Sequence, residues 1–187
     1  EAMLLKFIFL REYNSNIKLK ENIMDKYTIR NAVVSDANSI CQIYNHYVLN
    51  TTVTFETSAV ATDEMEKRIM DISSVYPYLV CEYEGNVIGY CYVSSWKNRC
   101  AYNSTAESSV YLHKDFTGQG IGSKLYEALF KKLDKGSLHA IIAGVAQPNE
   151  ASARLHERFG FEKVAHFKQT GRKFNQWIDV AYWEIIL

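Results

Sequence analysis

From Tyr27 onward, apolar positions follow first a strand period and then a helix period. The run Tyr27–Ala32 predicts a strand, because β-branched and aromatic residues recur in it. Ser35 is placed to cap a following helix, in which apolar residues such as Ile40 and Tyr44 share one stripe. A second amphipathic helix is predicted over Thr62–Ser74.

Three consecutive strands are predicted in the middle of the chain. Tyr78–Tyr83 and Val87–Ser95 are strand-like runs, and Glu84-Gly85-Asn86 between them is a hairpin signal. A polar loop over Trp96–Thr105 separates them from a third strand, Ala106–His113. The sequence therefore predicts a hairpin followed by a third strand here.

An amphipathic helix follows a glycine-rich turn. Ile121, Leu125, Leu129 and Leu133 recur at intervals of four and mark one buried face. The helix is expected to end in a basic segment, with Gly136 as its cap.

The last part of the chain again alternates strands and a helix. A strand is predicted at Leu138–Ala146, and a helix runs from Pro148 to Phe159, with Pro148 in its first turn and Gly160 at its end. Strands are predicted near Phe161–Lys168 and Trp177–Leu187. This order favours an α/β (α+β) fold, in which a sheet of mixed direction carries helices on both faces.

Length and composition indicate one domain. The chain has 187 residues, of which 48% are hydrophobic, enough for one substantial core. Residues 1–23 are expected to be an N-terminal extension that need not be native, with Met24 as a candidate start and residues 24–187 as the domain. The apolar run Met3–Leu10 is interrupted by Lys6 and lacks the features of a signal peptide.

Charge and cysteine content limit the possible partners. Lys plus Arg and Asp plus Glu number 21 each, so no global field attracts nucleic acid or a membrane surface. No metal site or redox dithiol is indicated, because the cysteines lack C-x-x-C spacing and a nearby histidine pair. We expect a cytoplasmic protein whose thiols are reduced and mostly buried: Cys41, Cys81, Cys91 and Cys100.

The glycine-rich turn has the architecture of an anion site. Gly118, Gly120 and Gly122 let the backbone approach a ligand, and the helix behind them presents unpaired amides and a partial positive charge. A P-loop is excluded because Ser123 and Lys124 stand in the wrong order, and the alternating glycines do not form the dinucleotide fingerprint. By itself, the run is equally compatible with a tight strand-to-helix turn.

Three features together resemble the GCN5-related N-acetyltransferase (GNAT) superfamily: the segments Val110–Gly122 and Pro148–Phe161, and the order of elements. Within it, the chain is most similar to phosphinothricin acetyltransferases and to amino-acid N-acetyltransferases that act on methionine sulfoximine or sulfone. Trp96–His113 and Trp177–Trp183 carry this closer resemblance. It implies an acetyltransferase fold with a mixed sheet of about seven strands.

The resemblance implies acetyl-coenzyme A (acetyl-CoA) as cosubstrate and no metal. The edge of Val110–Leu112 would pair with the pantetheine, and the Leu112 amide would face the thioester oxygen. Thr117 replaces the more common Gln or Arg, so weaker donor binding is expected; Asn149 could equally be a local cap. The implied cofactor-binding residues are Val110, Tyr111, Leu112, Thr117, Gly118, Gln119, Gly120, Ile121, Gly122, Ser123 and Asn149.

Two residues are candidates for catalysis. Glu107 would be the general base that takes a proton from the amine, although without the resemblance it would be simply an exposed strand carboxylate. His156 stands where many members of the superfamily carry Tyr. Because imidazole titrates near physiological pH, it could protonate the leaving thiolate or assist the base, or be an ordinary half-buried histidine.

The amine substrate is expected to be a small amino-acid analogue. Lys97, Arg99 and Tyr102 resemble the family's substrate-binding loop and would recognise an acidic group, with a solvated basic loop as the alternative. Phe55 and Tyr111 are weaker candidates for an apolar wall of the pocket.

Several functional alternatives remain open. We expect direct attack of the amine in a ternary complex, because no cysteine has an evident activating partner. The amine could instead belong to a protein N-terminus, a polyamine or an antibiotic. A non-catalytic acyl-CoA-binding module is supported only by Thr117. The resemblance also suggests a homodimer.

Overall fold

The computed structural model describes residues 26–187, so the predicted N-terminal extension over residues 1–23 and its boundary at Met24 lie outside the described residues. The strands are β1 Tyr27–Asn31, β2 Tyr78–Tyr83, β3 Asn86–Ser95, β4 Thr105–Leu112, β5 Ala140–Ala146, β6 Glu162–Lys173 and β7 Gln176–Ile186. The α-helices are α2 Ala37–Asn50, α3 Thr62–Ser73, α4 Ile121–Lys132 and α5 Glu150–Arg158.

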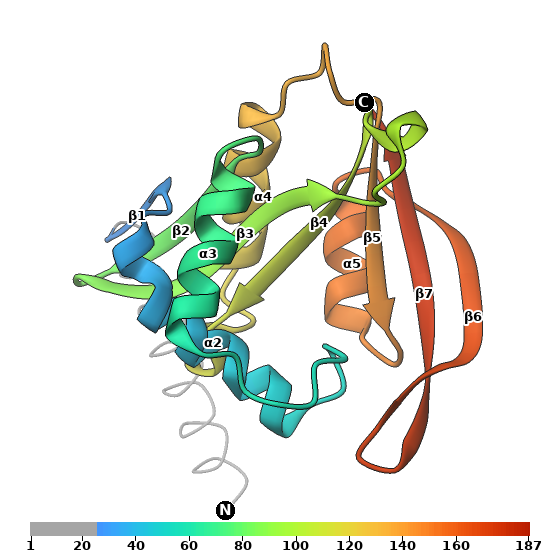
Figure 1. Ribbon diagram of the computed structural model, residues 1–187, viewed down its shortest axis with the longest axis horizontal. Helices are drawn as coiled ribbons and strands as arrows, with labels where there is room; N and C mark the ends of the chain where they lie inside the picture. Colours follow the sequence, from blue (N-terminus) through green and yellow to red (C-terminus); the bar gives the residue numbers. More distant parts are fainter. Residues whose placement is uncertain (1–25) are drawn as a thin grey trace, which may run out of the picture.

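The strands form one seven-stranded sheet in the order β1-β2-β3-β4-β5-β7-β6 (Figure 1). Neighbouring strands are antiparallel except β4 and β5, which are parallel. The predicted mixed sheet with helices on both faces is confirmed. The predicted β2–β3 hairpin is also confirmed, with its turn residues Glu84 and Gly85 at φ 48° and 78°.

Two cores cover opposite faces of the sheet. On one face, α2 and α3 pack residues such as Ile40 and Ile69 against Val80 of β2. On the other face, α4 packs Leu125 against residues that include Leu79. Successive residues of β2 thus face different cores, which explains why this strand reads as a continuous apolar run.

Some predicted helix ends are wrong because tertiary contacts determine them. Ser35 does not cap α2, because it lies inside a 3-10 turn over Val34–Asp36 (η1), and Asp36 is the N-cap residue. The Asp36 carboxylate accepts hydrogen bonds from Arg30 Nη1 at 2.7 Å and from the Val33 N–H at 2.9 Å. Buried pairing with Arg30 therefore fixes this corner.

The predicted ends of the two later helices also need correction. Helix α4 ends at Lys132, and Gly136 lies beyond it in a turn, where its N–H donates to Asp134 Oδ1 at 2.9 Å. Pro148 precedes α5 rather than occupying its first turn. Gly160 follows α5 with φ 86°, as expected for a residue that ends a helix.

The central parallel pair is short, and this creates the site. Only Thr105–Ala140, Ala106–Ile141 and Glu107–Ile142 pair between β4 and β5. Beyond Glu107 the two strands diverge, as Figure 1 shows. The rest of β4 and β5 therefore presents open backbone edges to a cleft.

Candidate active site

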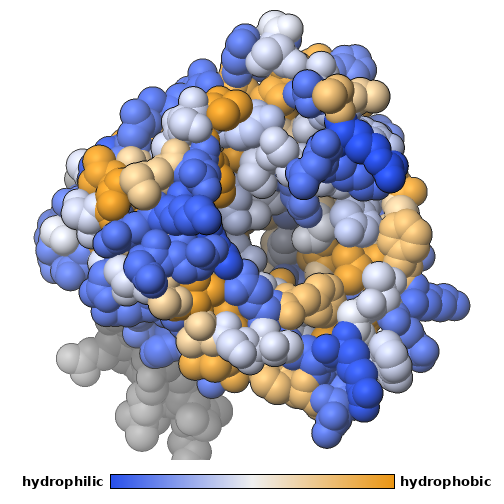
Figure 2. All heavy atoms as spheres, viewed as in Figure 1, coloured by the Kyte–Doolittle hydropathy of each residue, from blue (hydrophilic) through white to orange (hydrophobic). Residues whose placement is uncertain are grey.

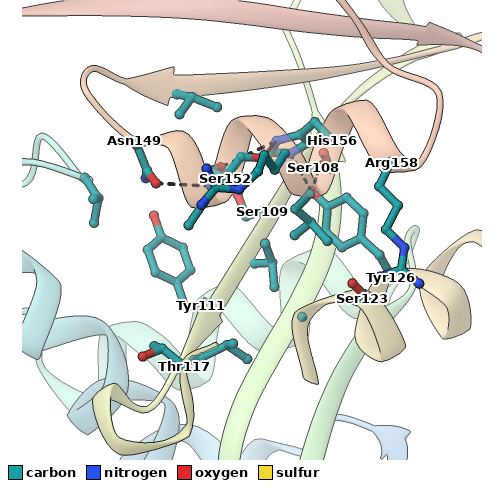
Figure 3. Close-up of a pocket in the computed structure, with 18 of the residues that line it drawn as sticks. Ser108, Ser109, Tyr111, Thr117, Ser123, Tyr126, Asn149, Ser152, His156 and Arg158 are labelled. Carbon is teal, nitrogen blue, oxygen red and sulfur yellow. Dashed lines mark hydrogen bonds between the residues drawn. The ribbon is translucent and has the colours of Figure 1, made fainter. Parts of the chain in front are cut away.

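A cavity of about 520 Å³ fills the cleft between β4 and β5. Its walls come from β4, the glycine turn, the start of α4, the end of β5 and one side of α5 (Figure 3). Figure 2 shows the molecule hollowed at the centre of the face in view. The two strands that part at Glu107 thus enclose a volume suited to an extended ligand.

The glycine turn is held in a conformation that favours glycine. Gly118 and Gly120 have φ values of 71° and 83°, in the left-handed region, and Gly120 is the N-cap residue of α4. A Cβ at either position would meet no atom within 4 Å, so glycine is favoured here by the backbone conformation and not by crowding. Amides at this helix start suit a pyrophosphate, so the turn fits the donor implied by the sequence.

The open edge of β4 presents the Leu112 peptide group to the cleft. His113 N–H donates to the Ile88 carbonyl at 2.8 Å, so Leu112, one residue earlier, directs its N–H and C=O away from β3. The Tyr47 hydroxyl donates to the Leu112 carbonyl at 2.6 Å. Tyr47 therefore fixes the orientation of this peptide group from α2.

Most of the predicted cofactor-binding residues line this cavity. Gln119 and Ile121 do not: Gln119 Nε2 donates to the Asp115 carbonyl at 3.0 Å, and Ile121 is fully buried in the core. Asn149 both lines the cavity and caps α5, since its side chain accepts from the Ser152 N–H at 3.1 Å. The residues that line it are Val110, Tyr111, Leu112, Thr117, Gly118, Gly120, Gly122, Ser123 and Asn149.

Two arginines of α5 also line the cavity, and the sequence interpretation missed them. Arg154 pairs with Glu150 at 3.0 Å, and Arg158 reaches toward the start of α4, where Ser123 lies (Figure 3). They stand four residues apart on a predicted helix, and this spacing could have indicated from the sequence that both lie on one face of the helix. They provide positive charge in a site where Thr117 provides none.

Glu107 is the last residue of β4 that pairs with β5; it is half-buried and lies outside the cavity lining, next to Gly144, which lines the cavity. The Ser108 side chain points to α4, so Glu107, the preceding strand residue, points to the opposite face, toward α2 and α3. Burial raises the pKa of the Glu107 carboxyl, and a hydrogen bond from the Gly144 backbone opposes the rise. A Cβ at Gly144 would lie 3.2 Å from Glu107 Oε1, so glycine allows this close approach.

His156 is buried and neutral. Its Nδ1 lies 2.7 Å from the Ser152 carbonyl, which can only accept, so Nδ1 carries the hydrogen and Nε2 is left as an acceptor. Burial lowers the pKa of His156 to about 4, although the bond to Ser152 opposes the shift. The expectation that this imidazole titrates near physiological pH is therefore wrong.

The residue that links His156 to β4 was not predicted from the sequence. The Tyr126 hydroxyl, from α4, lies 2.9 Å from His156 Nε2 and 3.0 Å from Ser108 Oγ. Tyr126 is fully buried, and burial raises its pKa. All three side chains line the cavity, so a hydroxyl with one proton and two acceptors stands at its wall (Figure 3).

The predicted substrate-binding residues do not gather around the cavity, although Lys97 Nζ lies 5.4 Å from the centroid of the Tyr102 ring. Tyr111 lines the cavity, whereas Lys97, Arg99 and Tyr102 lie outside its lining, near the start of β4. Lys97 Nζ lies 4.2 Å from the centroid of the Trp96 ring. Phe55 packs on Gly171 of β6.

Two further observations concern the described residues only. Across residues 26–187, no group of three or more His, Cys, Asp or Glu side chains could hold a metal ion. None of the helices in this part of the chain is long and apolar enough to cross a membrane.

Comparison with known proteins identifies the family. The sequence model of one protein family, described as acetyltransferase (GNAT) domain, matches residues 29–182 of the chain. The chain belongs to the GNAT acetyltransferase family. As a GNAT member, it is an acetyl-CoA-dependent N-acetyltransferase, and the predicted family and fold are confirmed.

Relatives of this GNAT protein have named activities. It is 39% identical over 160 residues to phosphinothricin N-acetyltransferase of Streptomyces coelicolor, covering 83% of this chain and 94% of that protein. It is 34% identical over 165 residues to the L-methionine sulfoximine/L-methionine sulfone acetyltransferase of Salmonella typhimurium, covering 86% and 94%. A Sinorhizobium meliloti phosphinothricin acetyltransferase in complex with acetyl-CoA superposes with a TM-score of 0.80 at 36% identity, covering 87% and 89%.

The buried imidazole of this GNAT protein predicts a pH-dependent stability. The His156 pKa is about 4 in the folded chain and 6.5 ordinarily, so between these values the unfolded chain binds more protons. The free energy of unfolding should therefore fall by up to about 3 kcal/mol between pH 6.5 and 4 through this residue alone. Urea unfolding across this range should show a weaker pH dependence for His156→Gln; equal slopes would contradict the assignment.

Proposed function

We propose that the protein transfers an acetyl group from acetyl-CoA to the α-amine of a small amino-acid-like compound such as phosphinothricin or methionine sulfoximine or sulfone. The observation that carries this proposal is the cleft itself, with the glycine turn in its lining and a half-buried carboxylate, Glu107, at the point where β4 and β5 part. Relatives named for these substrates are 34% and 39% identical to the chain.

The donor lies along the open edge of β4. The amides of the glycine turn and the start of α4 hold the pyrophosphate, and Arg158 adds a positive charge across the cavity. The edge that includes Val110 and Leu112 pairs with the pantetheine, as an added strand would. The Leu112 N–H points to the same side of β4 as the Leu112 carbonyl, which Tyr47 holds in place. This N–H then donates to the thioester oxygen and stabilises the developing negative charge.

The amine reaches the thioester from the other face of the sheet, where Glu107 points. The Glu107 carboxylate takes the amine proton, directly or through water, while the nitrogen attacks the thioester carbon. A carbon–nitrogen bond forms, the carbon–sulfur bond breaks and CoA leaves as a thiolate. Burial raises the Glu107 pKa toward that of its proton donor, which makes it a stronger base than an exposed carboxylate.

Tyr126, rather than a protonated His156, donates a proton to the leaving thiolate. His156 is neutral and has its hydrogen on Nδ1, directed at Ser152, so it has no proton to give on the Tyr126 side. The Tyr126 hydroxyl has two hydrogen-bond acceptors and lies in the cavity wall. It turns to the thiolate and supplies its proton, while His156 acts as a positioning residue.

The exposed loop with Lys97, Arg99 and Tyr102 gives a reason to expect a homodimer. In one chain these residues lie outside the cavity lining, so a role in binding the acidic group of the substrate requires contact across a dimer interface. Light scattering should give twice the mass of the chain; a monomer at assay concentration would exclude the homodimer.

Free thiols suit a reducing compartment, and we therefore propose that the enzyme is cytoplasmic.

The proposed reaction is tested by acetyl-CoA turnover with phosphinothricin, methionine sulfoximine, methionine sulfone, ordinary amino acids, polyamines and a peptide with a free N-terminus. Small sulfur- or phosphorus-containing amino acids should give the highest kcat/KM. Preference for the peptide or polyamines would assign a different amine, and CoA binding without any turnover would indicate a non-catalytic module.

Glu107→Gln should lower kcat by about 10²- to 10⁴-fold, because the amide cannot accept the amine proton. The affinity for acetyl-CoA should change little, since the donor lies along the other part of β4. In the unsubstituted enzyme, kcat/KM should be lost as pH falls through a Glu107 pKa above its ordinary value of 4.5. Steady-state kinetics with the exposed Glu162→Gln as control would show this, and equal activity in both variants would remove Glu107 from the role.

Tyr126→Phe should lower kcat by roughly 10- to 100-fold at nearly constant KM for both substrates. The ring contacts with Phe130 and Phe159 are kept, so the fold should survive the loss of the hydroxyl. The half-exposed Tyr76→Phe is a matched control. A thiol-release assay in which Tyr126→Phe turned over at the original rate would leave the hydroxyl a structural role only.

A further inference from the structure

Residues 51–61 connect α2 to α3, and we call this segment the strap (Figure 1). Val53 of the strap lines the cavity. Thr54 is buried, and its hydroxyl lies 2.9 Å from the Tyr44 hydroxyl and also interacts with Tyr111. The strap is therefore part of the wall on the face toward which Glu107 points.

Both ends of the strap are fixed to the helices that it joins. Asn45 of α2 holds Val60 with two hydrogen bonds: its Nδ2 donates to the Val60 carbonyl at 2.9 Å, and its Oδ1 accepts from the Val60 N–H at 2.8 Å. Glu56 accepts from Arg68 Nη1 of α3 at 2.7 Å and from the Tyr44 hydroxyl at 3.0 Å. These contacts all lie in the β1–β4 half of the molecule.

The middle of the strap contacts the other half, and we call this contact the clasp. Lys173 at the end of β6 is 3% exposed, and its Nζ donates to the Thr54 carbonyl at 2.8 Å. The Phe55 ring lies directly over Gly171, so close that a Cβ at position 171 would overlap the ring. The halves joined by the short β4–β5 ladder at one end of the cleft are thus joined again at the other.

We propose that the clasp, made by Lys173 with Thr54 and by Gly171 with Phe55, limits the size of the amine that reaches Glu107. The inference rests on the proposed function. Side chains at positions 107, 109 and 111 of β4 share the face covered by the strap, and Tyr111 touches Thr54. An amine bound at Glu107 therefore lies on the face of β4 that the strap covers, and the strap is held in place by its contacts with β6.

Two substitutions open the clasp by different means. Gly171→Ala adds a methyl group where the Phe55 ring now lies; because Phe55 is 41% exposed, the ring can swing outward. Lys173→Met keeps an apolar stem and removes the hydrogen bond to Thr54. The exposed Lys131→Met on α4 is the matched control for the second, and Gly171→Ala combined with Phe55→Ala is the control for the first.

The measurement is the ratio of kcat/KM for methionine sulfone to that for tryptophan. Gly171→Ala and Lys173→Met should each lower this ratio by roughly tenfold, with the KM for acetyl-CoA within about twofold of the original. With Phe55→Ala present, Gly171→Ala should have no further effect. An unchanged ratio in both clasp variants would overturn the proposal.

A binding measurement separates failure of the clasp from failure of the proposed function. Calorimetry with CoA bound reports amine affinity without turnover, and hydrogen exchange of amides 51–61 reports strap opening. If no amine is acetylated, the proposed function fails, yet tighter tryptophan binding and faster strap exchange in Lys173→Met would still support the clasp. Faster exchange with unchanged amine affinities would reduce the clasp to a structural contact and overturn the proposal.

Discussion

The parting of β4 from β5 after Glu107 is the constraint on which the rest of the site depends. A sheet interior normally satisfies every backbone amide and carbonyl by pairing, so an opening in its middle leaves polar groups that need other partners. Tyr47 satisfies one of them, the Leu112 carbonyl, from α2. The other exposed groups give β4 a backbone edge that can recognise an extended ligand by its own backbone-like amides, whatever side chains β4 carries.

Burial shifts the pKa values of the two candidate catalytic residues in opposite directions and favours the neutral form of both. It raises the pKa of Glu107 and lowers that of His156, because removal from water disfavours a charged carboxylate and a charged imidazole alike. The consequence is a neutral imidazole at physiological pH, which supports the proposal that Tyr126 rather than His156 donates the proton. The hydrogen bonds of His156 independently indicate that it has no proton to donate on the Tyr126 side, since its only N–H hydrogen is donated to the Ser152 carbonyl.

The sequence was informative wherever a local pattern determined the structure. Helical spacing at Met65 and Ile69 and the turn at Gly85 predicted elements that the fold contains. The predicted cap at Ser35 failed because Arg30 pairs with Asp36, and the predicted cap at Gly136 failed because Asp134 forms a local turn with Gly136 beyond the end of α4. Tyr126 could not be found from the sequence, since its contact with His156 joins residues 30 positions apart and its spacing is that of an ordinary core residue. The role of Lys97 and Arg99 in substrate binding remains a prediction, because neither residue lines the cavity of the single chain.

The four cysteines differ in a way that affects their chemistry. Cys41, Cys81 and Cys91 are buried, and burial raises the pKa of each thiol, to about 12 for Cys81. Since the thiolate is the reactive form, these three are protected from alkylating reagents in the folded protein. Cys100 is exposed and lies next to Arg99. The chain therefore carries a natural attachment point for a single fluorophore or spin label, located in the loop whose contacts most need to be followed in solution.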